Sequence, residues 1–126
     1  MEKQLKLLIS TEDGEWGREP MQRLAEKGGV AVFVKRDGTE LIRRIKDEKP
    51  QVVLMDMFMP GYDAMGVMHA ISEDTATEKP MYIVAASCPM PSLERELINQ
   101  GATYFAISPF NKTEMIERIY SLYSMK

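Results

Sequence analysis

The chain has a single cysteine, Cys88, so no disulfide bond can form within it. This is typical of proteins of the reducing cytoplasm, where we expect this protein to work. No apolar run approaches the roughly 20 residues of a membrane-spanning helix, so we expect no membrane association. The N-terminal segment MEKQLKLLIS has neither the long apolar region nor the cleavage site of a signal peptide.

The chain also has no large excess of positive or negative charge, and it has only one histidine. The 126 residues carry a net charge of −3, with basic and acidic residues interspersed. Without a basic patch, we expect no direct binding to nucleic acid. The one histidine, His69, falls beside the inward positions of a predicted helix and is expected at the surface. We therefore predict no histidine-dependent triad and no histidine metal cluster. Separately, we expect the chain not to be an enzyme.

Apolar runs alternate with helix-period segments along the chain. Strands are predicted at 5–10, 30–34, 51–56, 81–86 and 103–107, and helices at about 15–27, 37–47, 63–72, 89–100 and 111–123. The run VAVFV at 30–34 has no alternation, which predicts burial on both faces. The strict alternation predicts an α/β fold, a doubly wound, five-stranded parallel sheet with helices on both faces. We expect residues 1–126 to form one domain.

Local signals support several of these helices. The segments DGTE at 37–40 and NKTE at 111–114 are typical of helix starts closed by a capping box. In the helix before the fifth strand, Leu93, Leu97 and Ile98 are expected to face the core. We expect Trp16 to anchor the first helix by packing.

Acids gather where the predicted strands end, which is where sites form in such sheets. Asp56 follows the buried run VVLM directly, and Thr11, Glu12 and Asp13 follow the first strand. Two acids at neighbouring strand ends can hold Mg²⁺ through oxygen atoms and leave room for a phosphoryl group. A carboxylate can also be the nucleophile that accepts this group as an acyl phosphate.

Phosphoryl oxygens need positive charge close by. We predict no lysine or arginine at a strand end, since Ser108 stands where the fifth strand finishes. The sequence therefore predicts a site without its counter-charge.

Plainer interpretations stay open. Asp56 could be a turn residue at a strand end, and the acids after the first strand could mark a helix entry, because acids favour helix N-termini. A nucleotide- or flavin-binding domain of the same architecture would need a phosphate loop after the first strand. The segment STEDGEWG is acidic there and would repel phosphate, so this class is the least favoured.

Four stretches together resemble the response-regulator receiver domain of the CheY-like family, over essentially the whole chain. They are DG (37–38), KPQVVLMDMFMPGYDAMGVM (49–68), EKPMYIVAAS (78–87) and GATYFAISPFN (101–111). The last is similar to the family's Gly-Ala…Tyr-x-x-Lys-Pro-Phe pattern, with Ser108 in place of the lysine. MPGYDAMGVM and GATYFAISPF look most like the receivers of sporulation-type transcription regulators. The resemblance implies the flavodoxin-like (βα)5 architecture.

The resemblance also implies roles for matching positions. Asp56 matches the phosphoacceptor aspartate. Glu12, Asp56 and the backbone carbonyl of Phe58 match the metal ligands, and Phe105 matches the switch aromatic residue. Thr11 stands where the family has the first of two acids. A slip of one residue would pair Glu12 with Asp13 instead, but the spacing to Asp56 favours the first alignment.

Two further positions depart from the family pattern. Ala86 stands where the family has a hydroxyl residue, with Ser87 one residue later, and Ser108 stands at the lysine position. A neutral serine cannot replace the lysine's charge beside a phosphoryl group. With one acid also missing, we expect at most weak binding of Mg²⁺.

These departures favour a degenerate receiver that acts through protein–protein contact or dimerisation, with weak or absent phosphorylation at Asp56. The family often uses the face of its fourth helix, fifth strand and fifth helix for such contacts. The alternative is a competent receiver that takes phosphate on Asp56 from a histidine kinase or phosphotransferase with Mg²⁺. It would control an attached DNA-binding output domain, the only route by which we expect contact with nucleic acid.

Overall fold

One parallel sheet forms the centre of the molecule in the computed structural model, which describes residues 4–12 and 14–125. Its strands are β1 (Lys6–Ser10), β2 (Val30–Phe33), β3 (Val52–Asp56), β4 (Met81–Ala86) and β5 (Ala102–Ile107). Their spatial order is β2-β1-β3-β4-β5, the doubly wound order of the flavodoxin-like fold. The predicted fold class is confirmed.

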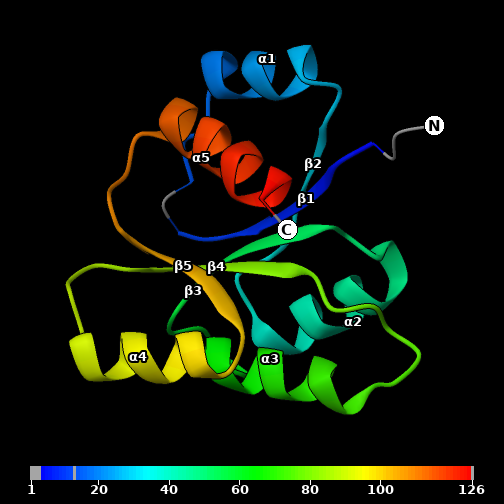
Figure 1. The fold of residues 1–126 in the computed structure, drawn as a ribbon, viewed down its shortest axis with the longest axis vertical. Helices are drawn as coiled ribbons and strands as arrows, with labels where there is room; N and C mark the ends of the chain where they lie inside the picture. Colours follow the sequence, from blue (N-terminus) through cyan, green and yellow to red (C-terminus); the bar gives the residue numbers. More distant parts are fainter. Residues whose placement is uncertain (1–3, 13, 126) are drawn as a thin grey trace.

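Five helices alternate with the strands and cover both faces of the sheet. They are α1 (Arg18–Glu26), α2 (Gly38–Glu48), α3 (Ala64–Glu73), α4 (Pro91–Asn99) and α5 (Lys112–Ser124). Helices α1 and α5 lie on one face, and α2, α3 and α4 lie on the other (Figure 1). Within residues 4–12 and 14–125, none of the helices combines the length and the apolar character that crossing a membrane requires.

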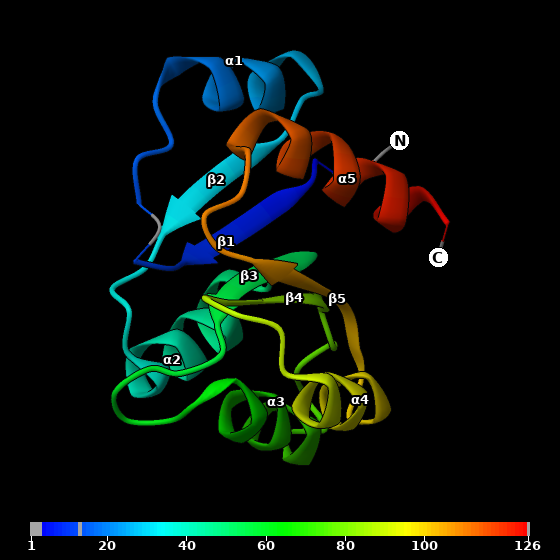
Figure 2. The same cartoon turned by 90° about the vertical axis from the view of Figure 1, so that its left-hand side faces the viewer.

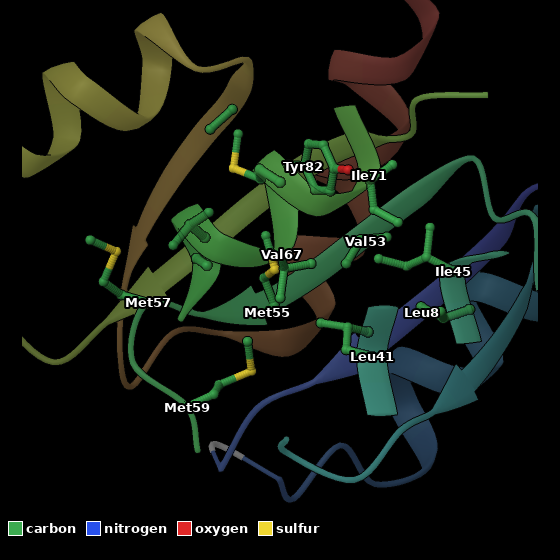
Figure 3. Packing of buried hydrophobic residues seen from close by; sticks show 14 of the residues in the cluster. Leu8, Leu41, Ile45, Val53, Met55, Met57, Met59, Val67, Ile71 and Tyr82 are labelled. Carbon is green, nitrogen blue, oxygen red and sulfur yellow. The ribbon is translucent and has the colours of Figure 1, made fainter. Parts of the chain in front are cut away.

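The central strands β3 and β4 are buried along their whole length. Successive side chains of a strand point to opposite faces, so each strand contributes to two separate clusters. Val53 and Met55 pack on the side of α2 and α3, as Figure 3 shows. Val52 and Leu54 pack on the side of α1 and α5. Burial on both faces explains why these runs are apolar without alternation.

Strand β2 differs from its prediction. It lies at the edge of the sheet with β1 as its neighbour, and its first three residues are only partly buried. Phe33, at its end, is 53% exposed. The prediction of burial on both faces was wrong. A short apolar sequence can form either an edge strand or a central strand, and its composition does not distinguish the two.

Both predicted capping residues begin their helices. The side chain of Asp37 accepts hydrogen bonds from the backbone N–H groups of Thr39 and Glu40, at 2.9 and 3.2 Å. Asn111 accepts one from the N–H of Glu114, at 2.9 Å. Each satisfies donors that a helix start leaves without an intrahelical partner.

Two expectations about the helices need correction. Helix α1 begins at Arg18 rather than near residue 15, because the chain first turns so that Trp16 packs edge-on against Phe33 and Phe110. Trp16 is nevertheless buried, as an anchor should be. In α4, Leu97 faces the core as predicted, but Ile98 is 48% exposed, since only a narrow stripe of this short helix meets the sheet.

The start of α2 packs closely against the loop between β3 and α3. The N–H of Gly38 donates a hydrogen bond to the carbonyl of Pro60, at 2.8 Å. A Cβ atom at Gly38 would overlap the carbonyl oxygen of Tyr62 and lie 2.6 Å from its amide nitrogen. Glycine is therefore required here by the close approach of two backbones.

Substituting Gly38 by alanine should push these backbones apart. We expect Gly38→Ala to lower the free energy of unfolding by about 1–3 kcal/mol in urea titrations, the usual cost of overpacking. Gly14→Ala is the matched control, because a Cβ atom there meets its nearest neighbour at an ordinary 3.6 Å. Equal stability of the two variants would contradict the close approach.

Candidate functional site

The carboxyl ends of the parallel strands meet at one edge of the sheet. The arrowheads of β1 and β2 mark this edge in Figure 2, and the two chain ends lie on the opposite side. A cavity of about 330 Å³ opens there, lined by Glu12, Asp56, Phe58, Ala85, Ala86, Ser87, Ser108 and Pro109. Six predicted site positions thus come together at one cavity: Glu12, Asp56, Phe58, Ala86, Ser87 and Ser108.

Asp56 ends strand β3 and is only 8% exposed. The hydroxyl of Thr11 donates a hydrogen bond to Oδ1 of Asp56, at 2.6 Å. The backbone N–H of Glu12 donates to Oδ2, at 3.0 Å. Thr11, where the resemblance expects an acid, therefore acts as a hydrogen-bond donor to the aspartate.

Burial raises the pKa of the Asp56 carboxyl above its ordinary value. The hydrogen bonds from Thr11 and Glu12 and the charge of Arg36 oppose this rise, and burial outweighs them. The ionised form of Asp56 is therefore disfavoured in the folded protein relative to the unfolded chain.

Arg36, between β2 and α2, contacts the predicted site residues, and the sequence prediction missed it. Its Nη1 donates to the carbonyl oxygen of Phe58, at 2.9 Å. Its Nε lies 3.8 Å from Oδ2 of Asp56, and its Nη2 lies 3.7 Å from Oε2 of Glu12. The prediction that no cation follows a strand end was wrong. The available signal was the pair Lys35-Arg36 directly after the second predicted strand.

The remaining predicted positions lie on β4, β5 and the loops that follow. The N–H of Ser108 donates to the carbonyl of Ala86, at 2.8 Å, which holds these two chain segments together. Ser87 is exposed at the cavity. Phe105 is partly buried and packs against the cluster under α2, α3 and α4, away from the cavity lining.

The family model for the response regulator receiver domain matches residues 8–120. The chain belongs to this family. Receiver domains are the parts of response regulators that act in two-component signalling, and this is the general function of the chain.

Named relatives agree with this assignment. The chain is 27% identical over 119 residues to protein-glutamate methylesterase/protein-glutamine glutaminase 5 of Myxococcus xanthus, covering 91% of this chain and 33% of that protein. It is 24% identical over 113 residues to transcriptional regulatory protein CseB of Streptomyces coelicolor, covering 89% and 47%. The chain thus spans less than half the length of either relative.

Solved structures show the same fold. The receiver domain of the putative response regulator NarL from Mycobacterium tuberculosis matches with a TM-score of 0.80 at 18% identity, covering 99% of this chain and 100% of that one. At this level of identity, the match describes the fold alone.

Receiver domains generally bind Mg²⁺ at the phosphorylation site. Glu12, Asp56 and the Phe58 carbonyl offer the oxygen atoms that Mg²⁺ prefers. The guanidinium of Arg36 lies against all three groups, and the side chain of Glu12 is 75% exposed. Among the described residues, no group of three or more acids, histidines or cysteines could hold a metal. Asp13, the alternative acid, lies outside the described residues. With the guanidinium of Arg36 against these oxygen atoms, the arrangement does not fit Mg²⁺.

The buried charge of Asp56 leads to a stability prediction. We expect Asp56→Asn to raise the midpoint of thermal unfolding by a few degrees at neutral pH, because the disfavoured ionised form is removed. The asparagine can keep both hydrogen bonds, since its NH₂ can donate to Thr11 Oγ1 while its oxygen accepts from the N–H of Glu12.

The control is Asp63→Asn, which removes the same charge from an exposed helix cap. Asparagine caps helices as well as aspartate does, so the midpoint should stay unchanged. A lower midpoint for Asp56→Asn than for the wild type would show that the ionised carboxylate stabilises the fold.

Proposed function

We propose that this receiver domain signals through contact with other proteins, and that Asp56 is phosphorylated weakly or not at all. The observation that carries the proposal is the lining of the cavity at Asp56. Ala86 and Ser108 face this space, at the positions where the receiver resemblance expects a hydroxyl residue and a lysine.

Electrostatics argues against a stable phosphoryl group in this cavity. Phosphorylation of a side chain adds about −1.5 to −2 charge at neutral pH. None of the eight described lining residues is basic, and two of them, Glu12 and Asp56, are acidic. Transfer of a phosphoryl group depends on fixed positive charge around its oxygens. Arg36 is engaged with Oδ2 of Asp56 and with the Phe58 carbonyl, and it is not among the lining residues.

Intact-mass spectrometry tests this part of the proposal. We expect no phosphoryl increment when the wild type is incubated with acetyl phosphate and Mg²⁺. The variant Thr11→Asp/Arg36→Gln/Ala86→Thr/Ser108→Lys restores the family's acid, hydroxyl and lysine and removes the guanidinium beside Asp56 and the Phe58 carbonyl, and it should gain one phosphoryl group. Adding Asp56→Asn to this variant should abolish the gain, which locates the phosphate.

A competent receiver domain treated in parallel shows that the donor is active. A stoichiometric increment on the wild type, lost in Asp56→Asn, would overturn the proposal in favour of a working phosphorylation switch.

The face formed by α4, β5 and α5 supports the proposed protein contact. Ile98 on α4 is 48% exposed and Ile107 on β5 is 40% exposed. On the same face, the guanidinium of Arg118 lies 5.2 Å from the ring centroid of Tyr104. Exposed apolar side chains beside an arginine–aromatic pair are typical of contact surfaces. The proposed partners are a kinase or phosphotransferase, an output domain, or a second copy of this chain.

Self-association provides the measurement for this face. In sedimentation experiments at high micromolar concentration, we expect the wild type to associate and Ile107→Asp to remain monomeric, because a charge replaces an apolar contact. Phe33→Asp is the matched control, since Phe33 is similarly exposed but lies on β2 at the other edge of the sheet. Equal association of the two variants would contradict the use of the α4–β5–α5 face.

A further inference from the structure

Three oxygen-bearing groups that match the family's metal ligands all contact one side chain of this chain. We propose that the guanidinium of Arg36 is the built-in cation of the site and that it keeps Mg²⁺ out. This inference deepens the proposed function, since a receiver that carries its own cation does not depend on a metal to arrange its site.

The contacts of Arg36 are spread over its whole guanidinium group. Nη1 makes a direct hydrogen bond to the carbonyl oxygen of Phe58, at 2.9 Å. Nε and Nη2 lie 3.8 and 3.7 Å from the carboxylates of Asp56 and Glu12, which are charge contacts rather than short hydrogen bonds. A planar group with several N–H donors suits such a divided arrangement of acceptors.

The backbone on both sides of Arg36 is held in place. The carbonyl of Lys35 accepts a hydrogen bond from the hydroxyl of Ser10, at 3.2 Å. Asp37 caps α2, and the N–H of Gly38 donates to the carbonyl of Pro60, at 2.8 Å. Arg36 therefore starts from a fixed position beside the site, which reduces the entropy lost when its side chain binds there.

The net charge of the site is also consistent with Arg36 taking the place of the metal ion. The receiver resemblance implies two acids after the first strand, which with the phosphoacceptor carry three negative charges against a divalent cation. Here Thr11 removes one acid, and Glu12 and Asp56 face the single positive charge of Arg36. Both sets leave one net negative charge. The loss of an acid and the gain of an arginine thus compensate each other.

Mg²⁺ bound to all three oxygen-bearing groups would have to displace Arg36 from them. The ion requires near-octahedral oxygen ligands at about 2.0–2.1 Å. Mg²⁺ and the guanidinium of Arg36 therefore cannot contact the same oxygen atoms at the same time. Displacement would break the hydrogen bond to Phe58 and bring like charges close together. We therefore expect removal of Arg36 to create affinity for the metal.

Titration of the purified chain with MgCl₂ tests the inference, by calorimetry and by the backbone amide shifts of Glu12, Asp56 and Phe58. The wild type should show little or no saturable binding. Arg36→Gln should bind Mg²⁺ about tenfold or more tightly, because the site then has two uncompensated carboxylates. Lys35→Gln is the matched control, since it removes the same charge from an exposed neighbour with no ion pair among the described residues.

Asp56→Asn in the Arg36→Gln background should abolish the gained binding, which places the metal at this site. Equal gains in Arg36→Gln and Lys35→Gln would overturn the inference, because the effect would then come from net charge alone. Tight, saturable shifts of the wild-type amides would overturn it as well, whether or not the Arg36 variant folds.

The readout separates this inference from the proposed function. A wild type that takes phosphate on Asp56 but does not bind free Mg²⁺ would contradict only the proposed function. A wild type that binds Mg²⁺ tightly but stays unphosphorylated would contradict only the role of Arg36.

Discussion

The rest of the site depends on one constraint: a carboxylate stands at the end of a strand that is buried on both faces. Water cannot fully solvate Asp56 there, so the surrounding chain has to stabilise its charge. Thr11 and Glu12 donate hydrogen bonds from the loop after β1, and Arg36 brings positive charge from the segment after β2. These contacts offset only part of the cost of burial, since the pKa of Asp56 is still raised.

All of this compensation comes from the β1 and β2 side of the site. The opposite side, at the ends of β4 and β5, offers the neutral residues Ala86 and Ser108 to the cavity. In a phosphorylated receiver, the added charge would face that neutral side. This asymmetry supports the proposed function, in which the site stabilises an unmodified aspartate better than a phosphorylated one.

The sequence predicted correctly which segments form strands. It failed for properties that depend on the order of the strands in the sheet, such as the burial of β2 and the position of Arg36. VVLM and MYIV were correctly predicted as strands and lie at the centre of the sheet, but VAVFV, predicted to be buried on both faces, lies at the edge, although its composition is similar. Arg36 was missed for the same reason. Only the pairing of β2 with β1 brings the end of β2 beside Glu12, and no local pattern records that pairing. Ile98 was misplaced because a short helix buries a narrower stripe than its apolar residues suggest.

The departures from the family motif at this site are connected, because their charges act on the same aspartate. Thr11 alone looks like a damaged metal site, and Arg36 alone looks like a surface cation between a strand and a helix. Together they replace a carboxylate and a divalent ion by a hydroxyl and a guanidinium, and each of these two pairs of groups carries one net positive charge. No cation replaces the family's lysine at Ser108 on the cavity side, because none of the described lining residues is basic. We therefore propose a site that holds its aspartate without a metal and that has no basic residue in its described lining where a phosphoryl group would lie.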